Sequence, residues 1–272
     1  MIRSAFQFLV LCSILVVACN DPAGKGSGAG TTGNDSTKII KQYHPNKKLK
    51  AEISVKDTVR HGITRTYSLS GTLFSEVMYL NGKRNGKAVN YYPDGKVNSV
   101  IYYKDNMKTG ESVWYYPSGK TYRVTPYLNG EPDGVQKIFY ESGKLQAEIP
   151  YTKGKKCPGL KEYLENGKLR MVPEILLEAD DRVALSGIFT LRISLSNQSR
   201  TVKYYTGLKN NGPCLSGYET SIPSRAGVGV YELPVLRGQT VMEKLDIIAV
   251  ETTSFGNERV LHKSYNLALR NR

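Results

Sequence analysis

The stretch from Gly82 to Asn106 reads GKRNGKAVNYYPDGKVNSVIYYKDN, and its pattern recurs through much of the chain. One aromatic position returns every 24 residues, at Tyr43, Tyr67, Tyr91, Tyr115, Phe139 and Tyr163. A fixed period of this length is typical of stacked arrays, in which each copy buries its apolar face only against its neighbours. The stretch therefore predicts a repeat array, which we place at residues 41–171.

Each repeat contains two segments with turn chemistry. The first is Tyr92-Pro93-Asp94-Gly95, with equivalents at Tyr116-Pro117-Ser118-Gly119 and Tyr140-Glu141-Ser142-Gly143. The second is Gly82–Gly86, with equivalents at Gly130–Gly134 and Gly154–Gly159. Glycine tolerates positive φ, and an Asp or Ser side chain can bond the local backbone, as hairpin turns require. Because Gly and Pro recur in this way, strands are favoured over helices.

Between the turns, apolar residues alternate with the period of two that strands show. We expect Val97, Ser99, Ile101 and Tyr103 to point to one face, and Tyr91 to join them. The opposite face is expected to carry one aromatic column, formed by Tyr92, Tyr116 and Tyr140 with the only tryptophan, Trp114, beside it.

This aromatic column is a candidate binding surface, because flat rings stack on sugars or receive partner side chains at little entropic cost. The alternative is a second buried layer. A lysine follows each turn glycine, at Lys96, Lys120 and Lys144. These lysines form a candidate basic stripe for an anionic polymer. Solvated turn lysines are the alternative.

The N-terminus has the pattern of an export signal over residues 1–18. A basic residue, Arg3, precedes an apolar run from Ala5 to Ala18, which is shorter than the roughly 20 residues of a spanning helix. Val16-Val17-Ala18-Cys19 resembles the lipobox of bacterial lipoproteins. The resemblance implies that Cys19 carries the acyl chains, palmitate included, that hold the protein on the outer membrane. An unlipidated secretory signal or an uncleaved anchor is the alternative.

Residues 19–40 are rich in Gly, Ser and Thr and predict a flexible tether. The formal net charge is +14, which in a cytoplasmic chain would suggest nucleic acid. Export instead favours acidic envelope surfaces, and we expect no nucleic acid partner. The alternative is that the charge only keeps a tyrosine-rich sheet soluble.

Cys157 and Cys214 remain after the signal and the lipidated cysteine. In an oxidising compartment they form one disulfide or stay as two thiols, and the sequence leaves both open. Neither a CxxC motif nor a Cys/His cluster is present, and there are only three histidines. The sequence therefore predicts no metal site, no cofactor and no enzyme.

The 24-residue period stops after Pro173. Residues 172–272 contain short alternating runs, such as Phe189–Leu195 and Leu245–Thr252, separated by turn signals. Strands at this spacing over about 100 residues predict an immunoglobulin-like β-sandwich.

The Gly-x-x-x-x-Tyr-Tyr-Pro-x-Gly-Lys pattern, clearest in Gly86–Lys96 and Gly110–Lys120, resembles the variant MORN repeats of YwqK-type antitoxin proteins. The resemblance implies a twisted antiparallel sheet of successive hairpins that acts as an interaction module. The Tyr-x-Gly-x-Trp opening of the standard MORN motif is absent. We therefore expect an all-β chain: a tandem hairpin array followed by the sandwich.

The expected function is a membrane-anchored, non-enzymatic binding or scaffold lipoprotein of the cell envelope that uses the repeat surface for protein partners. Two alternatives stay open. One is binding of a glycan or an anionic envelope polymer, and the other is an antitoxin or immunity role beside a toxin.

Overall fold

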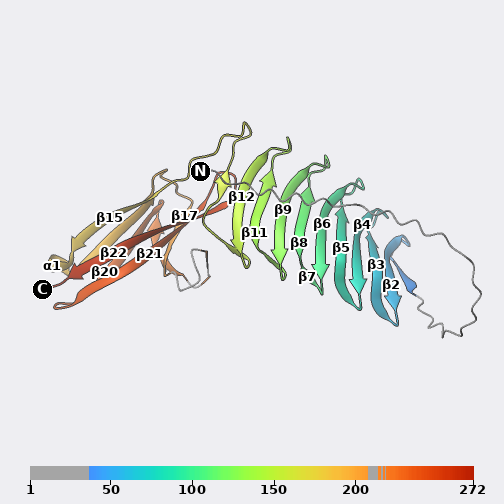
Figure 1. Ribbon diagram of the computed structural model, residues 1–272, viewed down its shortest axis with the longest axis horizontal. Helices are drawn as coiled ribbons and strands as arrows, with labels where there is room; N and C mark the ends of the chain where they lie inside the picture. The colour runs from blue at the N-terminus through green and yellow to red at the C-terminus, as the bar shows by residue number, and fades with distance from the viewer. Residues whose placement is uncertain (1–36, 208–213, 216, 218) are drawn as a thin grey trace, which may run out of the picture. The chain divides into compact units, whose positions relative to one another are not determined.

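The computed structural model describes residues 37–207, 214, 215, 217 and 219–272. Cys19, the predicted signal and most of the predicted tether lie outside the described residues. Within the described residues, no helix is long and apolar enough to cross a membrane. The fold is all-β, as predicted, with one long hairpin sheet followed by two smaller sheets (Figure 1).

The repeat region forms a 14-stranded antiparallel sheet. Its strands are β1 (Lys38–Tyr43), β2 (Leu49–Lys56), β3 (Val59–Tyr67), β4 (Leu73–Leu80), β5 (Lys83–Tyr91), β6 (Val97–Lys104), β7 (Met107–Lys108), β8 (Gly110–Tyr115), β9 (Thr121–Leu128), β10 (Glu131–Pro132), β11 (Gly134–Phe139), β12 (Leu145–Thr152), β13 (Lys155–Lys156) and β14 (Lys161–Glu162). The long strands follow one another across the sheet in chain order, and β7, β10 and β14 pair with β6, β9 and β12. Each repeat is thus one hairpin added beside the last.

The first predicted turn is a hairpin turn of constant backbone geometry. The Tyr92 N–H donates to the Lys96 carbonyl at 2.8 Å, and the Gly95 N–H donates to the Tyr92 carbonyl at 2.9 Å. The same two bonds recur around Tyr116 and Tyr140. Gly95 has φ +83, which explains the glycine that ends each of these tetrads.

The second turn is shorter than predicted. Strand β4 ends at Leu80 and β5 begins at Lys83, so only Asn81 and Gly82 lie between them. Their φ angles are +48 and +80, as in a type I′ turn, whose twist matches that of the flanking strands. The segment after Gly82, predicted as turn, is therefore the start of a strand.

Hydrogen bonds also link each type I′ turn to the preceding hairpin. The Gly82 N–H donates to the Arg60 carbonyl at 2.8 Å. The equivalent bonds are Gly130 to Lys108 at 2.9 Å and Gly154 to Pro132 at 2.8 Å. Each of these bonds joins residues 22 positions apart, so successive repeats meet through one repeated contact.

The assignment of side chains to the two faces of the array sheet differs from the prediction, and the difference arises at the Tyr92–Lys96 turn. Tyr91 pairs with Val97, while Asn90 pairs with Ser99, so Asn98 is bulged out. Tyr91 and Val97 therefore lie on the face of Val89, and Ser99 lies on the opposite face. A one-residue shift of register exchanges the faces of a strand, and sequence alternation alone does not reveal it. We call the two sides the Val89 face and the Ser99 face.

The C-terminal region is a sandwich of two four-stranded sheets. Its elements are β15 (Ile175–Arg182), α1 (Val183–Ser186), β16 (Ile188–Leu195), β17 (Val202–Thr206), β18 (Thr220–Ile222), β19 (Ser224–Arg225), β20 (Val228–Pro234), β21 (Thr240–Thr252) and β22 (Glu258–Arg270). The sheet orders are β15-β16-β20-β19 and β18-β17-β21-β22. If β18 is named C′ and the other strands are lettered A to G in chain order, the first sheet is the A-B-E-D sheet of an immunoglobulin fold, and the second has the order C′-C-F-G.

The main hydrophobic core lies in the sandwich and draws on both sheets. Phe189, Leu191 and Ile193 of β16 are packed in one cluster with Ile247 and Ala249 of β21. The buried side chains of the array form smaller clusters, such as Ile138, Ala147, Ile149 and Leu160. A single-layer sheet has no facing layer to fill a larger core, so stability in the array depends on contacts between neighbouring strands.

Two features connect the last repeat to the sandwich. Glu162, at the end of β14, accepts hydrogen bonds from Thr253, Asn257 and Arg259. Cys157 and Cys214 are joined in a disulfide.

Candidate binding surface

The predicted tyrosine column serves the array itself. The Tyr92 hydroxyl donates to the Tyr115 carbonyl at 2.6 Å, and the Tyr116 hydroxyl donates to the Phe139 carbonyl at 2.7 Å. The Tyr140 hydroxyl donates to the Tyr163 carbonyl, also at 2.7 Å. Each side chain is half-buried and joins its turn to the next repeat, 23 residues on. A partner at these tyrosines would contact the rings, because the hydroxyls are already bonded.

The column extends to the first repeat through a different residue. His44 occupies the equivalent position, and its Nε2 lies 3.0 Å from the Tyr67 carbonyl. An imidazole N–H donates here in place of a phenol. This histidine therefore has a structural role, in agreement with its place in the repeat.

Trp114 lies on the Ser99 face, because its cross-strand partners are Ser99 and Arg123. The prediction placed it on the opposite face, and the bulged turns account for the difference. The Arg123 guanidinium lies 4.1 Å from the centre of the Trp114 ring and 5.9 Å from that of Tyr122. Tyr122 packs edge-on against Tyr116, with ring centres 5.1 Å apart. Arg123 and Tyr122 thus link Trp114 and Tyr116 in one cluster.

The predicted lysine stripe is partly engaged. Lys96 Nζ donates to the Pro117 carbonyl at 3.0 Å and lies 3.2 Å from Asp94. Lys120 and Lys144 are exposed at the equivalent turns. The stripe therefore mixes one bridging lysine with solvated ones.

Removal of the Tyr116 hydroxyl, as in Tyr116→Phe, is expected to lower the free energy of unfolding by about 1 kcal/mol, because the Phe139 carbonyl loses its donor. Urea denaturation followed by circular dichroism measures the change. Tyr102→Phe is the matched control, since the Tyr102 side chain is exposed. An equal effect of the two substitutions would contradict the linking role of Tyr116.

The Ser99 face is largely satisfied by its own contacts. Small polar side chains bond across neighbouring strands, as Thr66 does with Ser75 at 2.7 Å and Asn90 with Ser99 at 2.9 Å. Tyrosine rings near the type I′ turns are covered by cations, for example Tyr103 by Arg84 at 4.3 Å. The Ser99 face therefore offers few free groups to a partner.

The Val89 face carries a continuous row of cross-strand neighbours. In order across the sheet, the row is Lys41, Glu52, Arg65, Glu76, Val89, Val100, Val113, Val124, Lys137, Glu148 and Lys161. Basic and acidic residues alternate at both ends, and four valines stand in the middle. We call the four valines the valine segment.

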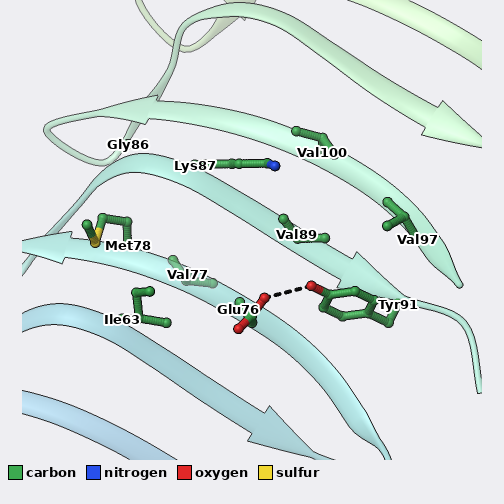
Figure 2. A pocket seen from close by; sticks show the side chains of 10 residues that line it. All are labelled: Ile63, Glu76, Val77, Met78, Gly86, Lys87, Val89, Tyr91, Val97 and Val100. Atoms are coloured by element: carbon green, nitrogen blue, oxygen red, sulfur yellow. Dashed lines mark hydrogen bonds between the residues drawn. The ribbon is translucent and has the colours of Figure 1, made fainter. Parts of the chain in front are cut away.

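The charged ends of the row are paired. Arg65 Nε donates to Glu76 at 2.7 Å, and Lys41 lies 3.5 Å from Glu52. The Tyr91 hydroxyl also donates to Glu76, at 2.6 Å, as Figure 2 shows. The Tyr91 and Arg65 hydrogen bonds lower the pKa of Glu76, and the same bond to Glu76, together with burial, raises the pKa of Tyr91 to about 12. Glu76 therefore stays ionised at neutral pH.

The valine segment is the part of this row without charge pairing. Val89, Val100, Val113 and Val124 come from β5, β6, β8 and β9 and face one another in sequence. Next to its first members lies a pocket of about 350 Å³, lined by Ile63, Glu76, Val77, Met78, Gly86, Lys87, Val89, Tyr91, Val97 and Val100 (Figure 2). Ile63 and Met78 are 39% and 42% exposed at its rim. The result is an apolar strip between two charged ends.

The sequence contains a signal for this row. The basic column at positions 41, 65, 137 and 161 becomes valine at 89 and 113, and the acidic column at 52, 76 and 148 becomes valine at 100 and 124. Lining up the repeats at their 24-residue period would have revealed both substitutions. Which columns face one another depends on the strand register, which only the structure gives.

The described residues contain no group of three or more His, Cys, Asp or Glu side chains arranged to hold a metal ion. The groups that the candidate surface offers are apolar area, charged side chains and aromatic rings.

Comparison with known proteins agrees with this architecture. A family model described as "MORN repeat variant" matches residues 37–57, 60–81, 84–105, 108–129 and 132–153. Each matched segment covers the two long strands of one hairpin and the turn between them. No curated protein matches the chain. Residues 37–153 therefore consist of variant MORN repeats.

Proposed function

We propose that this protein is a membrane-anchored, non-enzymatic scaffold of the bacterial cell envelope that binds a protein partner on its repeat array. The observation that carries the proposal is the valine segment, an uncharged interval in a row whose other members alternate between basic and acidic residues. Apolar surface drives most protein association, and charged groups around it orient the partner.

A polypeptide suits this surface better than a polyanion does. A polyanion needs a continuous stretch of positive charge, whereas the row alternates Lys41 with Glu52 and Arg65 with Glu76. Val89 is buried, whereas Val100, Val113 and Val124 are partly exposed. A polypeptide can cover these three valines with apolar side chains and place opposite charges over both ends.

The array itself suggests how to remove the surface without harming the fold. Val113 and Val124 occupy columns that hold lysine and glutamate in the last repeat, as Lys161 and Glu148. The double variant Val113→Lys/Val124→Glu extends the charge ladder with residues that the sheet already accepts. Leu236→Lys, at a 74% exposed site in the sandwich, is the matched control for adding a charge.

The experiment is affinity capture from an envelope extract, with wild type, the double variant and the control compared at equal loading. A defined polypeptide that wild type and Leu236→Lys retain, and that Val113→Lys/Val124→Glu loses, would support the proposal. Equal retention by all three chains would argue against the valine segment.

Anchoring rests on the lipobox-like sequence before Cys19 and has its own test. Cys19→Ser should move the protein from the membrane fraction to the soluble fraction, because acyl chains supply the membrane affinity. If Cys19→Ser stays in the membrane fraction, lipid anchoring is contradicted. The proposal of partner binding would still stand.

Two further binding measurements test the alternatives, polymer binding and an antitoxin or immunity role. Retention of the wild-type chain on an anionic glycan resin, reduced in Lys120→Ala/Lys144→Ala, would favour polymer binding, which the exposure of these two lysines supports. Capture of a toxin encoded beside this gene would assign an antitoxin or immunity role, which the resemblance to YwqK-type antitoxin proteins suggests.

A further inference from the structure

The tyrosine column that joins the turns has one interruption. The second repeat has Ser68 where other repeats have Tyr92, Tyr116 and Tyr140. The backbone at this turn is unchanged, because the Ser68 N–H donates to the Thr72 carbonyl and the Gly71 N–H donates to the Ser68 carbonyl, both at 2.9 Å. Only the side chain that would reach the next repeat is missing.

A pocket of about 340 Å³ occupies this interruption. It is lined by Ser68, Leu69, Ser70, Thr72, Leu73, Phe74, Tyr91, Tyr92 and Pro93. The Ser68 hydroxyl is engaged within its own turn, 2.6 Å from the Ser70 hydroxyl. It therefore leaves the space toward Tyr91 unfilled.

The neighbouring repeats show which chemical group fits the pocket. Carbonyls at Tyr67, Tyr115, Phe139 and Tyr163 each accept a hydrogen bond from a column side chain. Between Tyr67 and Tyr163, the remaining carbonyl of this series is that of Tyr91, and no side chain of the described array donates to it. The acceptor for a phenol is thus present, and its donor is absent.

Phe74 gives independent support for an aromatic occupant. It lies 24 residues before Asn98 and 48 before Tyr122, so these residues share a column. Tyr122 packs edge-on against Tyr116 at 5.1 Å. Phe74 lacks an equivalent partner, because its repeat has Ser68 in place of the column tyrosine. Its side chain is 59% exposed. An incoming ring would find in Phe74 the partner that Tyr116 finds in Tyr122.

We propose that the Ser68 pocket is a binding site for a phenol, namely a tyrosine side chain of a partner polypeptide. The hydroxyl donates to the Tyr91 carbonyl, and the ring packs between Phe74 and Tyr92. The inference deepens the proposed function by adding a specific contact point, and the pocket itself can be tested without the partner.

The test uses N-acetyltyrosinamide as a probe, with N-acetylphenylalaninamide as its analogue without the hydroxyl. Two-dimensional NMR of the wild-type chain should show shifts at Ser68, Phe74 and Tyr92, with about fivefold weaker binding of the phenylalanine amide, since one hydrogen bond is lost. The absence of saturable shifts with the tyrosine amide would overturn the proposal.

Ser68→Tyr supplies the missing side chain from within the chain. It should abolish probe binding and raise Tm by about 2–4 °C, as expected for one added favourable contact in a protein of this size. Unchanged probe binding in Ser68→Tyr would overturn the proposal. Should that variant fail to fold, Phe74→Ala removes the ring contact instead and is expected to weaken probe binding, whereas unchanged binding would overturn it.

Tyr116→Ser is the converse variant, because it recreates the interruption two column positions further along. It should bind the probe at a second site beside Phe139. Failure to gain this site would count against the inference that an empty column position binds a phenol. None of these measurements depends on anchoring or on the valine segment, so a negative result here would leave the proposed function standing.

Discussion

Replacement of Glu162 by alanine is expected to lower the free energy of unfolding by about 3–5 kcal/mol, because it breaks a buried charge network. The Glu162 side chain is fully buried. Four groups donate to its carboxylate: Thr253 Oγ1 at 2.6 Å, Asn257 Nδ2 at 2.9 Å, Arg259 Nη2 at 3.0 Å and Arg170 Nη1 at 3.1 Å. Without the carboxylate these donors lose their acceptor, and buried Arg259 retains only Glu251, at 2.7 Å.

Two further variants separate the causes. Glu162→Gln keeps an acceptor oxygen and loses the charge, so an intermediate loss is expected. Asp180→Ala breaks the exposed pair with Arg182, 2.8 Å away, and should cost less than about 1 kcal/mol. Urea denaturation followed by circular dichroism and by the fluorescence of Trp114, which lies in the array, measures these losses. A loss at Glu162→Ala as small as that at Asp180→Ala would contradict the network.

Loss of the Cys157–Cys214 disulfide is the second large expected effect. The two cysteines are 57 residues apart in sequence. A cross-link over a loop of this length restricts the unfolded chain by roughly 4 kcal/mol in the chain-entropy account. Cys157→Ser, Cys214→Ser and the double variant should therefore lose similar amounts of stability, since each removes the same bond.

The experiment uses residues 36–272, which form one compact unit and contain only these two cysteines. Reductant should lower the urea midpoint of the wild type to that of the double variant and leave the double variant unchanged. Thiol titration before reduction gives the direct control. Two free thiols per unfolded chain, or single variants as stable as the wild type, would show that the bond does not form.

The all-β architecture could be predicted from the sequence, because turns and strands depend on residues that are close together in the chain. The hairpin turn at Tyr92–Lys96 depends on residues next to one another, which a 24-residue period makes visible. The second turn was also visible in the period, but it was predicted at Gly82–Gly86 and lies at Asn81–Gly82. The sandwich was predictable because alternating runs such as Phe189–Leu195 are strands with one buried face.

The surfaces were less predictable, because they depend on pairing between residues distant in sequence. A single bulged residue, Asn98, exchanges the faces assigned to Val97 and Ser99. The bond between Glu162 and Arg259 joins residues 97 positions apart and has no local signal. The hydroxyl of Tyr92 could not be assigned to a carbonyl before the neighbouring turn was placed beside it.

The regular spacing of the links between repeats has a consequence for how such a chain can evolve. Gly82 bonds a carbonyl 22 residues back, and Tyr92 bonds one 23 residues ahead, with the same offsets at the later repeats. Duplication of a whole 24-residue unit preserves every offset, whereas insertion of a single residue within a strand disturbs all the bonds around it. Gene segments of 72 nucleotides are therefore the natural unit of gain and loss, and the length of the array can be adjusted in whole steps without redesign of any repeat.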